Sequence, residues 1–444
     1  MALAMRKRRL PSGPGAGNLA AGIAVYIGER RPRATHRESL CTDERVREMP
    51  EHDLTLGDVC VVDLSEDAAG PFCTKLLAGL GAEVIKVERP GSGDVSRRAG
   101  PFSGATPHPE QSALFLYLNT GKKSITLDVA SQTGAAILRG LVQECDILVE
   151  SFPPGYLDQW ALGYAALARL NPGLVYTSVT PFGQSGPYRD YKGSELIAQA
   201  MGALMQTIGL PHREPLKIGG NAALYATGMS AFSATMIALY ARDVQGYGQH
   251  VDISAMETIA VAQIHSSIHQ QFGHTPARRE SPLVRAKDGW LSPGLERGVR
   301  HDTWARVCEL IGRPDLKDNP AFNTPEARRE HQQDLLVILG AWTATRPKQE
   351  IYRIFQELQS VAGYVATVAD LFMSEQLAAR QFFQTIDHPC TGKARYPGAP
   401  FRIQGDTWRQ ARAPLLGEHN MHIYGGRLGC SAADLARLRG LGVI

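Results

Sequence analysis

Between residues 58 and 179 the sequence alternates short β-branched runs with helix-like segments, and this pattern limits the possible folds more than any other feature. Runs of this kind are typical of buried strands, and the segments between them repeat apolar residues with helical period. One such segment, Thr133–Glu144, follows Ser131, a favourable N-cap residue. The alternation predicts a doubly wound parallel sheet with helices on both faces, an α/β fold. The predicted strands are Val59–Leu64, Ala82–Val87, Ser124–Val129, Asp146–Glu150 and Leu174–Val179, and a further helix is Thr74–Leu80.

Composition shifts along the rest of the chain suggest how it divides into domains. Two Ala- and Met-rich segments, Ser194–Met205 and Ala222–Ala241, predict helices that pack closely through small residues. Charged amphipathic helices then follow, at Thr303–Ile311 and Glu326–Trp342. We therefore predict four regions: a disordered extension at 1–53, a large ligand-binding domain at 54–270, a smaller α+β domain at 285–362, and a loop-rich return to the large domain at 363–444.

Charge and cysteine usage exclude several classes of protein. The first 50 residues hold ten of the 47 Lys and Arg but five of the 44 Asp and Glu, so the remainder is slightly acidic, with 37 against 39. This excess fits a disordered leader, or a protein whose translation starts at Met49, better than a nucleic-acid-binding face. We expect no membrane span, because no apolar run reaches about 18 residues. Seven scattered cysteines indicate reduced thiols in the cytoplasm, and the histidines lack the spaced partners of a metal site.

Short motifs at the ends of predicted strands point to a ligand, each with an ordinary alternative. Ala69-Gly70-Pro71 lies between the first strand and the following helix, where doubly wound sheets bind ligands. An ordinary tight turn without a ligand would have the same residue types. Gly91-Ser92-Gly93 is not a dinucleotide-binding fingerprint. The basic residues Arg89, Lys122 and Lys123 are placed to meet nucleotide phosphates or to be solvated surface residues.

Several longer blocks resemble the family III CoA-transferases, the CaiB/BaiF group that includes formyl-CoA transferase, carnitine CoA-transferase and α-methylacyl-CoA racemase. The resemblance runs from about Leu54 to the end of the chain. It implies that acyl-CoA and a carboxylic acid are substrates, that no cofactor is permanently bound, and that an aspartate carries CoA through covalent intermediates. It also implies an interlocked dimer. The blocks are VVDLSEDAAGPFCTKLLAGLGAEVIKVERPGSGD, GKKSITLD, DILVESFPPG, LNPGLVYTSVTPFGQSGPYRDYKGSELIAQAMGALM, GYGQHVDISAMETI and RAPLLGEH.

The resemblance also implies which residues bind CoA. They lie after the successive predicted strands, and two more positions, Lys192 and Glu195, match residues that line the site of formyl-CoA transferase. The sequence departs from the family at Ser151, where asparagine is usual, and at Gln159, where arginine is expected. The positions that match the CoA site are Asp67, Ala68, Arg89, Leu127, Asp128, Ser151, Phe152 and Lys192.

The largest departure is Leu224, which stands where the family has its nucleophilic aspartate. Leucine has no nucleophilic atom, so the catalytic residue is unknown, with Glu195 as a weak candidate. Four interpretations remain open. The chain is an acyl-CoA transferase that uses another acid, a catalytically silent subunit paired with a related aspartate-bearing subunit, a CoA-binding protein without catalysis, or a racemase relative. A racemase would need a titratable residue where this chain has Gln199.

Overall fold

The computed structural model describes residues 54–444, except 211, 274–281, 296–300 and 404–407. The predicted disordered extension, residues 1–53, lies outside the described residues. The described chain forms two compact units. One unit takes 54–208, 216–273 and 382–444, and the other takes 209–215 and 282–381.

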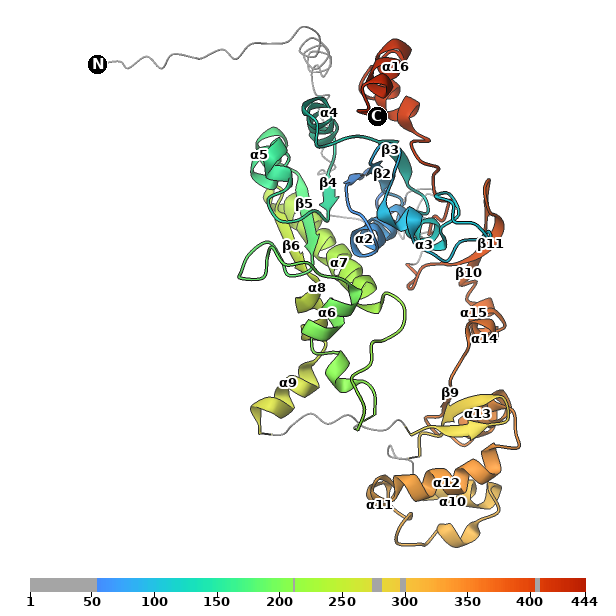
Figure 1. The fold of residues 1–444 in the computed structure, drawn as a ribbon. Helices are drawn as coiled ribbons and strands as arrows, with labels where there is room; N and C mark the ends of the chain where they lie inside the picture. The colour runs from blue at the N-terminus through green and yellow to red at the C-terminus, as the bar shows by residue number, and fades with distance from the viewer. Residues whose placement is uncertain (1–53, 211, 274–281, 296–300, 404–407) are drawn as a thin grey trace, which may run out of the picture. The chain divides into compact units, whose positions relative to one another are not determined.

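A six-stranded parallel sheet forms the centre of the large unit, in the order β3-β2-β1-β4-β5-β6 (Figure 1). This order reverses direction between β1 and β4, so the prediction of a doubly wound sheet is confirmed. The sixth strand, β6, was not among those predicted. The strands are β1 (Cys60–Asp63), β2 (Glu83–Glu88), β3 (Lys123–Thr126), β4 (Ile147–Glu150), β5 (Val175–Thr180) and β6 (His250–Ser254).

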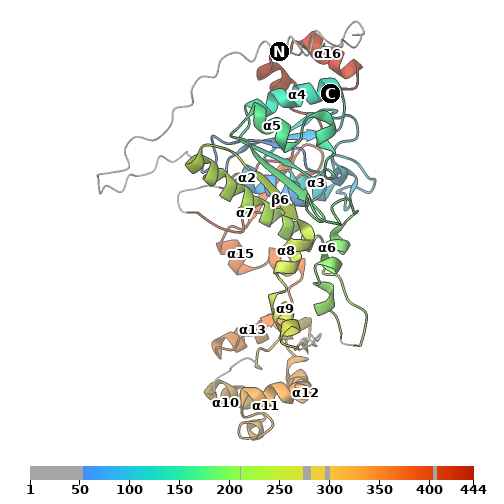
Figure 2. The ribbon, with the colours of Figure 1, turned by 90° about the vertical axis from the view of Figure 1, so that its left-hand side faces the viewer.

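Helices cover both faces of this sheet, each over its own hydrophobic core (Figure 2). On one face lie α2 (Ala69–Gly79) and α7 (Ala222–Gln245). On the other lie α4 (Gln132–Gln143), α5 (Tyr164–Leu170) and, from the C-terminal return, α16 (Ala432–Gly440). Strands β1, β4 and β5 are buried along their whole length, which explains why their sequences are rich in apolar and β-branched residues.

Helix α7 also has the length and hydropathy of a membrane span. It nevertheless packs against α2, β5 and β6, with Ala231, Ala238 and Leu239 in the core. Packing in this unit explains only part of its apolar character, because Ile237, Tyr240 and Val244 on the same helix are more than half exposed.

Between β1 and α4, two predicted boundaries were wrong by several residues. Helix α2 begins at Ala69 instead of Thr74, because Gly70 lies so close to Ser65 that a Cβ there would be 2.2 Å from the serine Cβ, and Pro71 is tolerated in a first turn. Strand β3 ends at Thr126, because the N–H of Asp128 turns away to the carbonyl of Val443. The predicted N-cap is present, since the Ser131 hydroxyl accepts from the Gly134 N–H at 3.0 Å.

The rest of the large unit contributes shorter elements around the sheet. The C-terminal return contains an antiparallel hairpin in addition to loops. These elements are η1 (Val95–Arg98), α3 (Ala113–Leu118), η2 (Leu157–Trp160), α6 (Glu195–Met201), η3 (Met205–Thr207), α8 (Ala255–Val261), α9 (Ile264–Gln271), β10 (Phe383–His388), β11 (Gly392–Pro397) and η5 (Met421–Gly425).

The smaller unit has an α+β fold with its own core around the buried Trp304. A three-stranded antiparallel sheet joins β7 (Val284–Ala286), β8 (Gly289–Ser292) and β9 (Gly363–Tyr364). The segment predicted as one helix at Glu326–Trp342 is divided at His331. The helices are α10 (His301–Leu310), η4 (Pro314–Leu316), α11 (Pro325–Glu330), α12 (Gln332–Thr343), α13 (Lys348–Glu357), α14 (Val368–Phe372) and α15 (Glu375–Ala379).

Candidate active site

A cavity of about 150 Å³ opens at the carboxyl edge of the large sheet, where the strand order reverses between β1 and β4. Open α/β sheets bind ligands at this point, because the loops after the two strands diverge and leave a crevice. The cavity is lined by the loops after β1, β4 and β5, by the end of β5, and by the first residues of α2, α7 and α8. They are Glu66, Asp67, Ala69, Gly70, Ser151, Val179, Thr180, Pro181, Gly193, Ser194, Leu224, Thr227 and Ala255.

The loop after β1 is held by hydrogen bonds to the last residue of β1 and to the loop after β4. The N–H and hydroxyl of Ser65 donate to Asp63 Oδ1, at 3.0 and 2.5 Å. The N–H of Glu66 donates to the Ser151 hydroxyl at 2.8 Å, which ties this loop to the one after β4. Asp67 then takes a left-handed conformation, with φ of 70°, directly before α2. These contacts fix the floor of the cavity.

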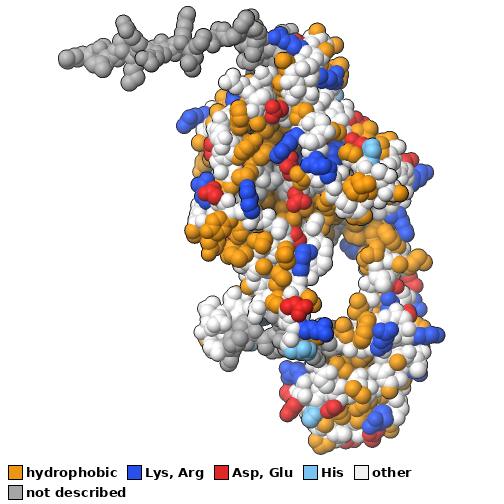
Figure 3. Space-filling model, viewed as in Figure 1, with side chains coloured by type: hydrophobic (Ala, Val, Ile, Leu, Met, Phe, Trp, Pro, Cys, Tyr) orange, Lys and Arg blue, Asp and Glu red, His pale blue; other side chains and the backbone are white. Residues whose placement is uncertain are grey.

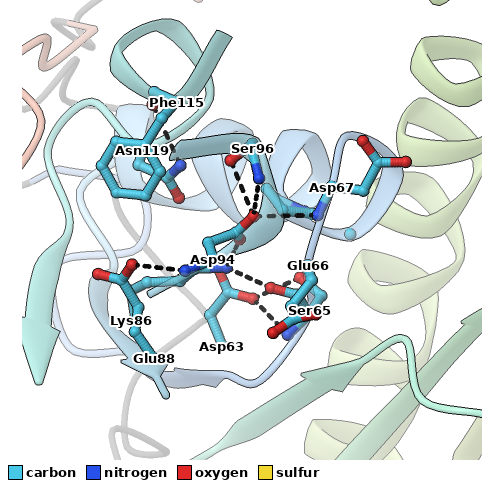
Figure 4. Close-up of polar contacts among 12 residues, drawn as sticks. Asp63, Ser65, Glu66, Asp67, Lys86, Glu88, Asp94, Ser96, Phe115 and Asn119 are labelled. Atoms are coloured by element: carbon cyan, nitrogen blue, oxygen red, sulfur yellow. Dashed lines mark hydrogen bonds and ion pairs between the residues drawn. The ribbon is translucent and has the colours of Figure 1, made fainter. Parts of the chain in front are cut away.

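Below the loop lies a network of fully buried charges (Figure 4). The Lys86 ammonium lies 2.6 Å from Asp94 Oδ2 and 3.9 Å from Asp63 Oδ2, and Lys122 lies 3.0 Å from Asp63. Burial alone would raise the pKa of Asp63, but Lys122 and Lys86 outweigh it and lower that pKa to about 2. The Asp67 N–H donates to Asp94 Oδ1 at 3.2 Å, so this network also holds the cavity loop.

The start of α7 is capped by a residue from another helix. Its N-cap, Asn221, makes no side-chain capping bond. Instead the buried carboxylate of Glu195, on α6, accepts the Ala223 N–H at 3.0 Å and the Leu224 N–H at 2.9 Å. Gln199 also donates to it, at 2.5 Å. Both oxygens of Glu195 are thus occupied by donors that a helix N-terminus otherwise leaves unsatisfied.

The first turns of α2 and α7 approach each other closely beside the cavity. A Cβ at Gly228 would lie 2.4 Å from the Ala69 carbonyl oxygen, so only glycine permits this distance. The rings of Phe72 and Tyr225 meet edge to face at 5.0 Å between centroids. This packing brings Leu224 to the same cavity as the loop after β1.

The structure brings some of the predicted CoA-binding residues together and leaves others apart. Asp67 and Ser151 line the cavity, and Lys192 precedes its lining residue Gly193. The Arg89 side chain is 62% exposed and lies 3.3 Å from Glu66. The other four positions lie elsewhere around this edge: Ala68 is buried beneath the loop, Leu127 is in the core, Asp128 accepts the Ala130 N–H, and Phe152 stacks on Tyr156.

A second cavity, of about 250 Å³, lies at β4, β5 and β6 and was missed in the sequence. Its wall includes Glu150, Asp158, Ser178 and His250, and the Ser178 hydroxyl lies 2.9 Å from His250 Nε2. Burial raises the pKa of Glu150 to about 7, which the Ser178 hydroxyl and the Phe152 N–H only partly oppose. The position of Glu150 at a strand end was the signal available in the sequence.

Fold and cavity together define a doubly wound α/β protein with a ligand site at the carboxyl edge of its sheet. Comparison with known proteins identifies the family. The sequence profile of CoA-transferase family III matches residues 56–420. This match covers most of the chain, so the protein belongs to CoA-transferase family III, whose members move CoA between a thioester and a carboxylic acid.

Individual relatives agree with this assignment. A succinyl-CoA–D-citramalate CoA-transferase of Chloroflexus aurantiacus is 34% identical over 401 residues, covering 88% of this chain and 98% of the relative. A formyl-CoA:oxalate CoA-transferase of Streptomyces avermitilis is 32% identical over 412 residues, covering 88% and 99%. Among solved structures, a CaiB/BaiF family protein from Brucella suis superposes with a TM-score of 0.76 at 30% identity, covering 84% of this chain and 100% of that protein.

Proposed function

We propose that this chain transfers CoA from an acyl-CoA to a short carboxylic acid in the cavity at the β1–β4 switch point. The observation that carries the proposal is the place of that cavity, since the loops that line it come from the sequence blocks that resemble the family. Arg89, exposed at the end of β2, is suited to bind CoA phosphates through charge-assisted hydrogen bonds. The α2 N-terminus at the cavity would favour an anionic group of the substrate.

The acid is proposed to be a small dicarboxylate. The names of both relatives include one, oxalate in one and citramalate in the other. A cavity of about 150 Å³ has room for a molecule of that size beside the thioester. The enzyme would work in the cytoplasm with CoA thioesters as substrates and without a resident cofactor.

The working form is proposed to be a dimer, either of two copies or with a related subunit that carries the aspartate. Apolar side chains are visible on the surface of the large unit in Figure 3. On α7, on α9 and at the C-cap of α9 several are more than half exposed, and apolar surface of this kind commonly marks a protein interface. They are Ile237, Tyr240, Val244, Ile264 and Phe272.

A silent subunit is the second candidate function, and Leu224 favours it. In that case the chain would bind CoA esters, and the partner would supply the nucleophilic carboxylate. The Glu195 carboxylate is engaged at the α7 N-terminus, which makes it a poor substitute nucleophile.

Steady-state CoA transfer by the purified chain alone tests the proposed function. The donors are succinyl-CoA and formyl-CoA, the acceptors oxalate and citramalate, and product thioesters are separated chromatographically. We expect turnover with at least one pair, and CoA binding by calorimetry. Binding without turnover, with activity appearing only when an aspartate-bearing family member is added, would favour the silent subunit.

A further inference from the structure

Only two acidic residues line the cavity in the described part of the chain, and they differ in their partners. Glu66 forms an ion pair with Arg89 at 3.3 Å. The carboxylate of Asp67 makes no hydrogen bond or ion pair with any described residue, and its side chain is exposed. Figure 4 shows it pointing away from the buried network. Asp67 therefore presents an available carboxylate at the cavity.

The backbone of Asp67 is firmly positioned although its carboxylate has no partner. Its φ of 70° is uncommon outside glycine, and its N–H is bonded to Asp94, which is held by Lys86. The next residue, Ala68, is fully buried and begins the approach to α2. An uncommon conformation that its surroundings fix in place is characteristic of functional sites.

Asp67 faces the same cavity as Leu224, the position where the family has its nucleophile. The close packing of α2 on α7 at Gly228 places the two helix starts side by side. A carboxylate on the loop before α2 therefore faces the same cavity that an aspartate on α7 would face. The Ala69 and Gly70 segment at the start of α2 lines this space, and Ala68 provides no side-chain cap for that helix.

We propose, on the basis of the function proposed above, that Asp67 is the nucleophile of this chain and replaces the carboxylate missing at Leu224. One Asp67 oxygen attacks the thioester carbon, the C–S bond breaks, and CoA leaves as the thiolate from a mixed anhydride. The thiolate attacks the Asp67 carbonyl carbon, the donor acid leaves as a carboxylate, and an aspartyl-CoA thioester remains.

The acceptor completes the cycle by the same two reactions in reverse order. Its carboxylate attacks the aspartyl thioester and expels the CoA thiolate, which forms a second anhydride. The thiolate then attacks the acceptor acyl carbon, and the product thioester leaves with Asp67 restored as a carboxylate. No net proton or electron is gained or lost, so no further reactant is needed.

The surroundings suit this role. Although Asp67 is exposed at the cavity, the protein around its carboxylate partly desolvates it and raises its pKa, and the charges of Asp94 and Glu195 raise that pKa further. An ionised carboxylate that its surroundings make more basic is a stronger nucleophile. The first N–H groups of α2 are placed near the reacting group, where they would favour the charge that develops on the thioester oxygen.

Transfer of ¹⁸O tests the assignment. In the proposed cycle the donor acid leaves with one Asp67 oxygen, and the acceptor returns one of its own. The full chain is incubated with succinyl-CoA and ¹⁸O-labelled oxalate or citramalate, then digested. Fragment mass spectra of the peptide from Glu48 to Lys75 are expected to show a gain of 2 Da on Asp67.

Asp67→Asn is the main variant, with Asp243→Asn, at the far end of α7, as the matched control. We expect Asp67→Asn to lose at least a thousandfold in turnover and to lose the label, while its melting temperature stays within 2 °C of wild type. Asp243→Asn should keep both activity and label.

The outcomes separate this inference from the proposed function. Turnover with the label on another residue, or retained by Asp67→Asn, would overturn the role of Asp67 and leave the transferase activity standing. CoA binding without any turnover or label in the wild-type chain would overturn both and leave the silent subunit. The inference is supported if Asp67→Asn loses the label while wild type and Asp243→Asn keep it.

Discussion

The two halves of the sheet's carboxyl edge differ in whether their buried carboxylates have a cation beside them. At β1 and β2, the buried acids Asp63 and Asp94 both lie beside a buried lysine. Lys86 pairs with both of them, and Lys122 pairs with Asp63. At β4 and β5, Glu150 is also buried, but the described residues around its cavity include no Lys or Arg. Compensation lowers the pKa of Asp63 to about 2, whereas burial raises that of Glu150 to about 7.

This difference shows what each half can do. Compensation keeps the Asp63 carboxylate and the Lys86 ammonium charged near neutral pH, so this network suits the rigid support of a loop, here the one that carries Asp67. An uncompensated carboxylate changes its charge near neutral pH and makes its side of the sheet sensitive to pH. Substitutions in the compensated half should therefore change the free energy of unfolding itself, and substitutions in the other half should change its dependence on pH.

Among these substitutions, replacing Lys86 in the compensated half should lower the free energy of unfolding most. In Lys86→Met, Asp94 keeps a buried charge without its cation, and breaking a buried pair in this way costs about 3–5 kcal/mol. The free energy of unfolding from denaturant titration measures this loss.

The matched control for that experiment is Lys123→Met on the neighbouring strand. Lys123 pairs with Glu83 but is one-third exposed, so its loss should cost no more than about 1 kcal/mol. Adding Asp94→Asn to Lys86→Met should recover part of the stability. Equal losses for the two lysines would contradict the view that burial makes Lys86 important.

On the uncompensated half, Glu150→Gln should remove a pH dependence. The folded pKa of Glu150, about 7, lies above its ordinary value of 4.5. The group therefore contributes stability below pH 4.5, and this contribution is lost as the pH rises through 7. Between pH 4.5 and 8, wild type should lose on the order of 2–3 kcal/mol relative to the variant.

Thermal unfolding across that pH range measures the difference. Glu144→Gln, at an exposed position after α4, is the control and should follow the wild-type curve. Parallel curves for wild type and Glu150→Gln would mean that Glu150 is not protonated in the folded state near neutral pH.

The ion pair of Arg89 and Glu66, after the ends of β2 and β1, should matter for ligand binding and hardly at all for stability. Arg89→Ala should weaken CoA binding about tenfold, as expected for one charge-assisted hydrogen bond to phosphate. Its ion pair with Glu66 is largely exposed, so unfolding should change by less than about 1 kcal/mol. Calorimetry with CoA measures the first effect.

Arg169→Ala, on α5, provides the matched loss of an exposed arginine away from the cavity. It should bind CoA as wild type does. If the two variants have the same affinity, Arg89 does not contact CoA.

Local sequence determined most of the sheet and several of its helices. Strands β1, β2, β4 and β5 were predicted because each is a run of β-branched or apolar residues bounded by turn-forming ones. The Ser131 cap was predicted for the same reason, since its partner is only three residues away. The departure at Leu224, and with it the question of which group acts as nucleophile, was also evident from the sequence.

Tertiary structure decided where the charges and helix ends go. Glu195 bonds to the start of α7 at a sequence separation of 28 residues, and Lys122 bonds to Asp63 at a separation of 59. No local sequence pattern therefore predicts either contact. The same is true of the early start of α2, which depends on Gly70 packing against Ser65. Whether a carboxylate is a cap, a buried ion pair or an available nucleophile depends on which donors surround it, and those donors come from segments that only the folded chain brings together.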